Sequence, residues 1–163
     1  MTDDGLDALY DATIVRRARE ARGLRVPENA AYRAKISNPL CGDRVEVGLV
    51  MADARVLELG FRARGCALSL ASAHLLRELV ADLGLSEARE LIGAFRAALE
   101  ADRETPAAPE GPAQGELAAA LAPLLPVRRF PSRVRCATLV CEAALEALAG
   151  RPASPTPPSL DGA

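Results

Sequence analysis

Phe61-Arg62-Ala63-Arg64-Gly65-Cys66-Ala67-Leu68-Ser69-Leu70-Ala71-Ser72-Ala73 is the stretch that decides the fold. It predicts the end of a strand, a turn at one glycine and the start of a helix. The first turns of that helix carry small side chains, so other backbone can approach it closely. Cys66 stands where the first helical N–H groups lack intrahelical partners, at the positive end of the helix dipole. This position favours the thiolate, which is the better nucleophile and the better metal ligand.

Two segments with alternating apolar residues precede Cys66 and predict an antiparallel hairpin with one buried face. The residues expected on that face are Val45, Val47, Leu49, Leu57, Leu59 and Phe61. Asp53-Ala54 marks the turn between the strands. A loop with Cys41 then lies at the start of one strand, and Cys66 lies at the end of the other. The two ends of a hairpin are neighbours, so these cysteines are expected to share a site although 25 residues separate them.

The loop Asn38-Pro39-Leu40-Cys41-Gly42-Asp43 places a thiol and a carboxylate on either side of a glycine. Gly42 can adopt backbone angles that aim both side chains at one point. A thiolate together with a carboxylate suits zinc or ferrous iron. The motif alone is equally compatible with Asp43 as a turn or cap residue that has Cys41 merely beside it.

The remaining chain predicts helices around this hairpin. They are expected over residues 6–20, from Cys66 to about Leu83, from an N-cap at Ser86 to about Glu100, from Glu116 to Leu125, and from an opening at Cys136 to Ala149. The segment before Cys136 is expected to be extended. The first helix turns Arg16, Arg17 and Arg19 outward, either as a solvated face or as a docking patch for an acidic partner. The predicted fold class is α+β, a small antiparallel sheet packed against several helices.

Domain organisation follows from length and local composition. A chain of 163 residues suggests one domain, here residues 1–150. Residues 101–120 are expected to form a mobile insertion, because they are rich in Pro, Gly, Ala and acids. Residues 151–163 form a Pro-rich tail that is expected to be disordered.

Charge and hydropathy exclude several classes of protein. The net charge of −2 argues against nucleic-acid binding through bulk charge. No apolar run approaches the roughly 20 residues of a membrane span. The N-terminus is acidic, where a secretory signal would be basic. We therefore expect a cytoplasmic protein that binds neither nucleic acid nor membrane.

The chain has four cysteines and one histidine. Disulfides are unexpected in a reducing compartment, which leaves metal or thiol chemistry and buried structural cysteines as alternatives. Cys141 lies about 140° around a helix from Cys136 and is expected in the core. His74 lies about 12 Å along a helix from Cys66, and about 80° around it. It is therefore expected to be a structural or surface residue and not a ligand.

Three motifs occur in a fixed order along the chain. They are Asn38-Pro39-x-Cys41-Gly42-Asp43, Gly65-Cys66-Ala67-x-Ser69-x-Ala71-Ser72-Ala73 and Phe130-Pro131-x-Arg133-Val134-x-Cys136-Ala137-Thr138-Leu139. Over residues 6–149 the sequence resembles the IscU/NifU N-terminal-domain family of iron–sulfur cluster assembly proteins. It is most similar to the SufU branch, because it has the extra segment 101–120 and carries Arg135 where scaffold-type members have histidine.

The resemblance implies that Cys41, Asp43, Cys66 and Cys136 bind one zinc ion (Zn2+) or a nascent Fe–S cluster. Arg133 matches the arginine of the third motif and is expected to offset the negative charge of the ligands; Arg64 and Arg135 are further candidates. The implied partners are a PLP-dependent cysteine desulfurase of the SufS type, and the downstream cluster assembly machinery or apo-proteins.

Three functions remain open. A zinc-dependent sulfurtransferase would accept persulfide sulfur from the desulfurase, with Cys41 as acceptor because it lies on a loop. A scaffold would assemble a [2Fe–2S] cluster on the same residues and transfer it to apo-proteins. A structural zinc protein would only bind a partner.

Overall fold

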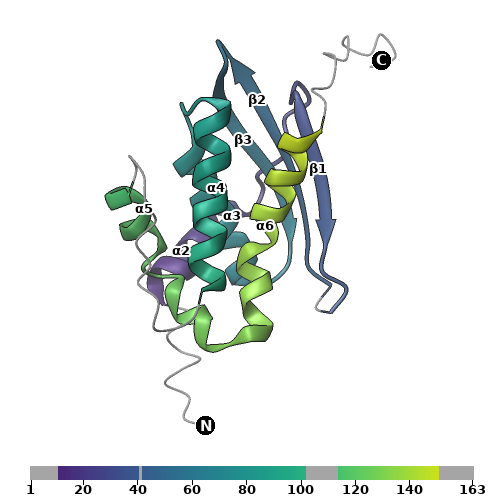
Figure 1. Ribbon diagram of the computed structural model, residues 1–163. Helices are drawn as coiled ribbons and strands as arrows, with labels where there is room; N and C mark the ends of the chain where they lie inside the picture. Colours follow the sequence, from purple (N-terminus) through teal and green to yellow (C-terminus); the bar gives the residue numbers. More distant parts are fainter. Residues whose placement is uncertain (1–10, 41, 102–113, 151–163) are drawn as a thin grey trace.

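The computed structural model describes residues 11–40, 42–101 and 114–150 (Figure 1). In chain order its elements are α2 (Ala12–Ala21), β1 (Tyr32–Ser37), β2 (Arg44–Ala52), β3 (Arg55–Arg64), α3 (Ala67–Val80), α4 (Leu85–Glu100), α5 (Gln114–Leu121), the 3-10 helix η2 (Leu125–Arg129) and α6 (Pro131–Ala149). The strands form one antiparallel sheet in the order β1-β2-β3. Helices α3 and α6 pack on one face of this sheet, α4 lies against α6, and α2 runs beside α3. The predicted α+β class is confirmed.

The predicted hairpin is present as β2 and β3, but the sheet has a third strand that the prediction lacks. In β1, Tyr32, Ala34 and Ile36 turn toward the core, and the residues between them are exposed. Ser37 pairs with Arg44, so the loop with Cys41 connects two neighbouring strands. The strand β2 is therefore central, and the site lies where β1 ends and β2 begins.

The prediction that Leu57 lies on the buried face of the hairpin is wrong. Val50 pairs with Glu58 and Met51 pairs with Val56, which leaves Leu57 as an extra residue in β3. This β-bulge breaks the two-residue period. The side chain of Val56 is consequently buried in the core, while Leu57 is 60% exposed.

The second face of the hairpin is also partly covered, contrary to the expectation of one buried face. A Cβ atom built on Gly48 would lie 2.5 Å from Val26 Cγ1. One built on Gly60 would lie 2.2 Å from Pro27 Cδ. The segment between α2 and β1 therefore crosses the outer face of the sheet at these two glycines, where a larger side chain would not fit.

Helices α3 and α4 meet at a different point from the predicted one. Helix α3 ends at Val80, and the chain turns at Asp82, which has a φ of 66°. The Asp82 N–H donates to the Val56 carbonyl at 2.8 Å, which ties this turn to the start of β3. Helix α4 then begins at Leu85 with Gly84 at the N-cap position. Ser86 therefore lies inside the first turn and is not the cap.

The last helix begins one turn earlier than expected. Helix α6 starts at Pro131, because a proline has no N–H to lose and suits the first helical position. Arg128 and Arg129 belong to η2, so the approach to Cys136 is not extended. Cys136 accordingly lies in the second turn of α6 and does not open the helix.

Several predicted segments lie partly outside the described residues. Helix α2 is described from its N-cap Asp11, whose side chain accepts a hydrogen bond from the Ile14 N–H at 3.0 Å. Residues 6–10 of the predicted first helix fall outside, as do 102–113 of the predicted insertion and the tail 151–163. Helix α5 follows the gap and buries Leu117 and Leu121. Within the described part of the chain, no helix is long and apolar enough to cross a membrane.

Candidate metal centre

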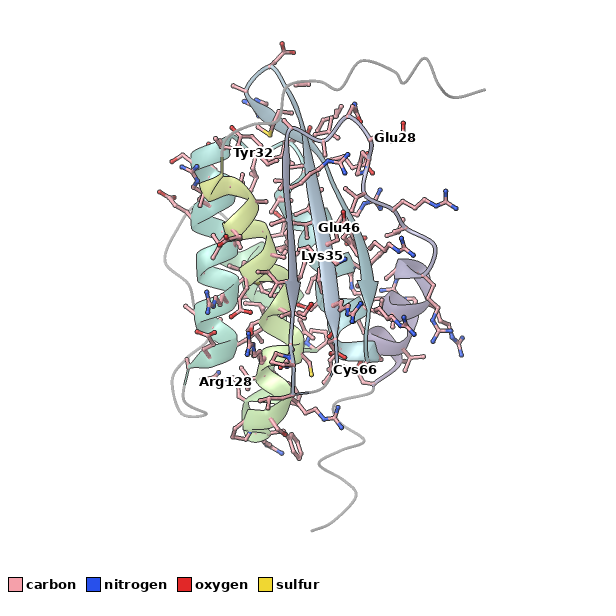
Figure 2. The ribbon with its side chains drawn as sticks, turned by 90° about the vertical axis from the view of Figure 1, so that its right-hand side faces the viewer. Glu28, Tyr32, Lys35, Glu46, Cys66 and Arg128 are labelled. Atoms are coloured by element: carbon pink, nitrogen blue, oxygen red, sulfur yellow. The ribbon has the colours of Figure 1, made fainter. Side chains whose placement is uncertain are left out.

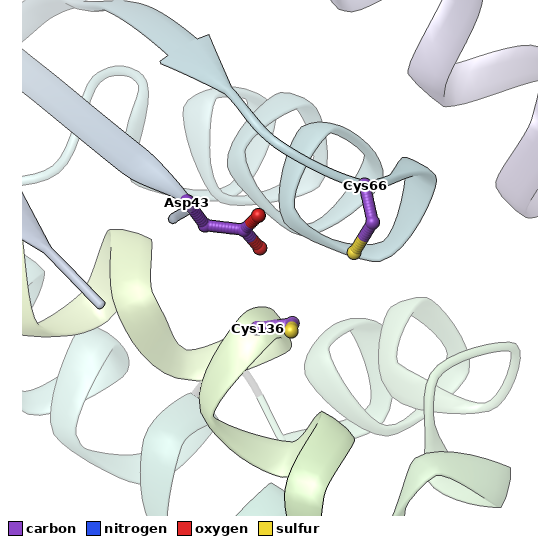
Figure 3. A group of neighbouring side chains, drawn as sticks. All are labelled: Asp43, Cys66 and Cys136. Carbon is purple, nitrogen blue, oxygen red and sulfur yellow. The ribbon is translucent and has the colours of Figure 1, made fainter. Parts of the chain in front are cut away.

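Three of the four predicted ligands converge on one point (Figure 3). One carboxylate oxygen of Asp43 and the sulfur atoms of Cys66 and Cys136 all lie within 4.8 Å of one another. Asp43 directly precedes β2, Cys66 precedes α3, and Cys136 lies in the second turn of α6. The sheet and both helices that cover its core face thus contribute to this group.

The carboxylate of Asp43 is buried and held in place. Asp43 is 5% exposed, and the backbone carbonyl of Asp43 accepts a hydrogen bond from the Asn38 N–H at 2.8 Å. A Cβ atom built on Gly65 would lie 2.7 Å from Asp43 Cγ. The glycine at the β3–α3 turn is therefore required by the close approach of this carboxylate.

The loop before Asp43 is organised by Asn38. This buried side chain accepts a hydrogen bond from the Leu40 N–H at 3.1 Å, and the Asn38 carbonyl accepts one from the Gly42 N–H at 2.8 Å. Gly42 has a φ of +75°, a conformation that favours glycine. Cys41 lies outside the described residues, and its place among the ligands stays a prediction.

Ser69 is a site residue that the sequence analysis treated only as a small side chain. Its hydroxyl donates to Asp43 Oδ2 at 2.7 Å and also lies 3.0 Å from the Cys136 carbonyl oxygen. Its oxygen is 3.9 Å from Cys66 Sγ. The sequence could have indicated Ser69 as a site residue, because it lies three residues after Cys66 and residues three apart lie on the same side of a helix.

The two described cysteines differ in their surroundings. Cys66 is half-buried at the N-cap of α3, and its side chain makes no capping hydrogen bond. The predicted position of Cys66 at the start of this helix is confirmed. Cys136 is 1% exposed. Cys66 is thus the more accessible of the two.

This donor set fits a metal ion. Two sulfurs and a carboxylate oxygen are ligands that zinc prefers, and neighbouring ligand atoms around a tetrahedral zinc lie about 3.3–3.8 Å apart, given metal–ligand bonds of about 2.0–2.3 Å. The observed spread of at most 4.8 Å comes close to this range. A fourth ligand would complete the tetrahedron, and Cys41 is the predicted one.

The arginines predicted to offset the ligand charge lie in different places. Arg135 Nε lies 3.6 Å from Glu142 Oε2, so this guanidinium is already paired on α6. Arg64 is exposed at the end of β3. Arg133 is half-buried in the first turn of α6, and its backbone N–H donates to the Phe130 carbonyl at 2.7 Å. The role of Arg133 toward the ligands stays a prediction.

His74 is a structural residue between α2 and α3. It is 7% exposed, and burial lowers the pKa of its imidazole. Arg17 NH1 lies 3.1 Å from His74 Nδ1, and Glu20 Oε2 lies 3.6 Å from Nε2. His74 is not among the residues that converge on the metal centre, as predicted.

Cys141 is a core residue, as predicted. It is fully buried, and burial raises the pKa of its thiol far above the ordinary range. The side chain therefore remains a protonated thiol, which is neither a good nucleophile nor a good ligand.

Comparisons with known proteins agree with this architecture. Residues 10–121 match the model of the NifU-like N terminal domain, a match that ends before Cys136. The chain is 30% identical over 114 residues to the iron–sulfur cluster assembly scaffold protein IscU of Streptococcus pyogenes serotype M1, covering 70% of this chain and 67% of that protein. It is 25% identical over 134 residues to the zinc-dependent sulfurtransferase SufU of Bacillus subtilis strain 168, covering 82% and 85%.

Solved structures show the same fold. A NifU-like N-terminal protein from Brucella abortus superposes with a TM-score of 0.74 at 25% identity, covering 89% of this chain and 95% of that one. A SufU structure from Fervidobacterium islandicum AW-1 gives a TM-score of 0.72 at 22% identity, covering 86% and 96%. The chain therefore belongs to the NifU-like N-terminal-domain family, the scaffold family of iron–sulfur cluster assembly.

Proposed function

We propose that this protein is a zinc-dependent sulfurtransferase that accepts persulfide sulfur from a PLP-dependent cysteine desulfurase and passes it to cluster assembly. The proposal rests on one observation, the compact buried group of Asp43, Cys66 and Cys136. Cys41 would complete the zinc site. The similarity to a zinc-dependent sulfurtransferase over most of both chains supports the same assignment.

The compactness of the ligands favours a single ion over a cluster. A cluster with two iron atoms divides its ligands between two metal centres, so at least two of any three ligands lie on opposite sides of it. A single zinc ion instead holds all its ligands in one tetrahedron. Three ligand atoms mutually within 4.8 Å match the second arrangement better.

The transfer step is a thiol–disulfide type of exchange. The Cys41 thiolate attacks the outer sulfur of the persulfide on the donor cysteine. The sulfur–sulfur bond of the donor breaks, and its electron pair leaves with the donor thiolate, which then takes up a proton. Cys41 becomes the persulfide, so sulfane sulfur moves without any external oxidant or reductant.

The other predicted ligands have a different role from Cys41, because they would keep the ion in place. Zinc, when bound, keeps the cysteine ligands deprotonated at neutral pH. Asp43, which accepts a hydrogen bond from Ser69 and packs against Gly65, and Cys136, buried in α6, would hold the ion while Cys41 reacts. Cys41 is the ligand assigned to leave because its sequence surroundings predict a loop.

Metal and sulfide analysis tests the proposal. Protein purified without oxygen should carry about one zinc per chain and no acid-labile sulfide. A triple variant with Cys41, Cys66 and Cys136 changed to alanine should lose the zinc. Cys141→Ala, the matched control, should retain it. Zinc that survives in the triple variant would show that the site is elsewhere.

A desulfurase assay tests the role of Cys41. The protein should accelerate sulfur release by a cysteine desulfurase, and Cys41 should carry the labelled sulfur afterwards. Undiminished acceptance of sulfur by Cys41→Ser would overturn the assignment of Cys41. A wild-type protein that binds zinc but gives no acceleration would support a structural zinc protein instead.

A cluster scaffold is the second candidate, because the Streptococcus pyogenes relative is a cluster assembly scaffold protein. The same residues would then bind a [2Fe–2S] cluster as cargo for apo-proteins. Iron with a matching amount of sulfide and a brown colour in the anaerobic protein would favour the scaffold over the sulfurtransferase.

A further inference from the structure

A groove of about 740 Å³ lies between the end of α2, the segment that follows it, and the end of β3. Its lining carries five arginines and a single acidic residue, Glu46. The arginines are Arg22, Arg25, Arg33, Arg62 and Arg64. We call this surface the arginine groove. Because the whole chain has a net charge of −2, the positive charge is local to this surface.

Among the described residues, none of the five arginines forms an ion pair with a carboxylate. Arg33 is the exception in having a defined contact, since its NH2 donates to the backbone carbonyls of Pro27 and Glu28 at 2.7 and 2.8 Å. No carboxylate within ranges 11–40, 42–101 and 114–150 pairs with the other four guanidinium groups. Outside the groove, arginines do form ion pairs: Arg17 pairs with Glu78, and Arg96 pairs with Glu100, both at 2.9 Å. The groove therefore holds guanidinium groups that remain available to a ligand.

The strand register places further charged residues beside the groove. Arg44 and Arg64 are directly paired neighbours on β2 and β3. Like charges opposite one another destabilise a sheet. Glu46 of β2 lies opposite Lys35 on one side and Arg62 on the other, and it is the only acid among these positions; Lys35 and Glu46 are labelled in Figure 2. An anion bound beside Arg44 and Arg64 would offset the repulsion between their charges.

The groove leads directly to the metal centre. Its lining includes Arg64 and Gly65, which directly precede Cys66 in the chain, and Leu70 of α3. Gly65 also contacts the Asp43 carboxylate, so the end of the groove and the ligand share this backbone. Whatever binds in the groove therefore lies beside the more accessible of the two described cysteines.

The shape and chemistry of the groove indicate its occupant. Small-molecule pockets are mostly apolar and enclose their ligand. This groove is open, and six of its 13 lining residues are charged. Guanidinium groups bind carboxylates in a two-pronged geometry. A succession of carboxylates on an extended polypeptide would meet several of these arginines at once.

We propose that the arginine groove binds an acidic segment of the partner protein that exchanges sulfur with the metal centre. The docked segment brings the reacting cysteine of that partner to Cys66 and the neighbouring loop. The inference rests on the proposed function only in naming the partner as the sulfur donor; the binding of an acidic segment is independent of it.

A peptide of about ten glutamates with a fluorescein label is the probe, and fluorescence anisotropy is the measurement. Binding should weaken steeply between about 50 and 200 mM salt, because it is electrostatic. The double variant Arg25→Gln/Arg62→Gln should weaken binding about tenfold. The matched control, Arg16→Gln/Arg129→Gln, removes two exposed arginines outside the groove and should change it less than twofold. Both variants should keep the wild-type zinc content and melting temperature.

Several outcomes would overturn the inference. Equal weakening in both double variants would mean that net charge is responsible and the groove is not. Equally tight binding of a single-stranded oligothymidine of similar charge would indicate a general polyanion site. Full displacement of the peptide by millimolar inorganic phosphate would indicate a small-anion site.

A desulfurase titration separates this inference from the proposed function. The groove variant should need about tenfold more protein for half-maximal stimulation, with an unchanged maximal rate, since Cys41 and the zinc site are intact. Normal stimulation by the groove variant would overturn the inference alone. Peptide binding by a wild-type protein that never stimulates the enzyme would overturn only the proposed function.

Discussion

Ser69 joins three elements of the metal centre through one hydroxyl group. It lies on α3, donates to the Asp43 carboxylate at 2.7 Å, and approaches the Cys136 carbonyl of α6 at 3.0 Å. A hydroxyl has one proton to give, and the shorter contact is to the charged acceptor. The hydrogen bond therefore orients the carboxylate that faces the two cysteine sulfurs.

Replacing Ser69 should weaken metal binding more than it weakens the fold. Ser69→Ala is expected to lower zinc affinity about 10- to 100-fold, since groups that orient ligands have effects of this size. Competition with a zinc-binding dye measures the affinity. Ser72→Ala is the control, because Ser72 also donates to a carbonyl of α6, that of Ala137, without touching a ligand. It should cost about 1 kcal/mol of stability and leave zinc affinity unchanged. Equal zinc affinities for the two variants would refute the role of Ser69.

Burial favours the neutral form of His74, as do the nearby Arg17 and Arg77, while Glu78 and Glu20 oppose it. Burial lowers the pKa of the imidazole below its ordinary value of 6.5. Arg17 NH1 lies 3.1 Å from Nδ1, so this nitrogen accepts a hydrogen bond and Nε2 carries the proton toward Glu20. Protonation of Nδ1 would set two donors against each other.

The free energy of unfolding should therefore decrease as pH falls, and part of this decrease should come from protonation of His74. The unfolded chain binds the proton more readily than the folded one, so the loss begins as pH falls through about 6.5 and ends below the lowered pKa. Urea unfolding of metal-free protein at pH 7.5 and 5.5 measures it. His74→Gln should lose less stability than the wild type over this interval, by at most about 1.4 kcal/mol per pH unit. Identical losses in both proteins would show that His74 does not contribute.

At the scale of elements, the β3–α3 turn fixes the distance between the sheet and the ligand-bearing helix. Gly65 lies against the Asp43 carboxylate, where a Cβ atom would be 2.7 Å from Cγ and 2.8 Å from Oδ1. Such a contact is too short for any side chain. The turn can therefore carry only glycine while Asp43 keeps its place.

Gly65→Ala should accordingly displace Asp43 and reduce zinc affinity at least tenfold, while the helices remain folded. Gly93→Ala on α4 is the control, since nothing lies within 4 Å of a Cβ atom there. It should leave zinc affinity unchanged and add about 0.5–1 kcal/mol of stability through helix propensity. Zinc titration with circular dichroism on both variants measures these effects, and wild-type zinc affinity in Gly65→Ala would contradict the packing argument.

The β-bulge at Leu57 makes a prediction that separates neighbouring residues of one strand. Leu57→Ala should change the free energy of unfolding by no more than about 0.5 kcal/mol, because the side chain is 60% exposed. Leu59→Ala should cost about 2–5 kcal/mol, because Leu59 is fully buried. Urea denaturation gives both values. A large loss of stability in Leu57→Ala would contradict the bulge, because it would mean that Leu57 is buried as regular alternation predicts.

For the whole molecule, the candidate metal centre joins the sheet to both helices of its core face. A metal that binds only the folded state stabilises it by about 4 kcal/mol at a concentration a thousandfold above its dissociation constant. Removal of zinc with a strong chelator should therefore lower the melting temperature of the wild type by several degrees. The variant with Cys41, Cys66 and Cys136 changed to alanine should melt at the same temperature with and without chelator. An equal shift in that variant would show that the stabilising metal binds elsewhere.

The sequence by itself determined the features that depend on local order. Alternating residues predicted β2 and β3, and a glycine before a cysteine predicted the start of α3 at Cys66. The helical phase placed Cys141 in the core. The hairpin argument placed the loop that ends in Asp43 beside Cys66, and the resemblance added Cys136. These features follow from periods and caps that span a few residues, which a single sequence carries directly.

Only the tertiary structure decided the features that depend on pairing between distant segments. The bulge that exposes Leu57 exists because β3 has one residue more than β2 between fixed pairs, and no local pattern counts residues on another strand. Ser69 became a site residue because α6 and the start of β2 meet at its hydroxyl. The arginine groove likewise gathers side chains from the segment after α2, from β1 and from β3. Local sequence sets the conformation of each segment, but contacts between segments depend on how the whole chain packs.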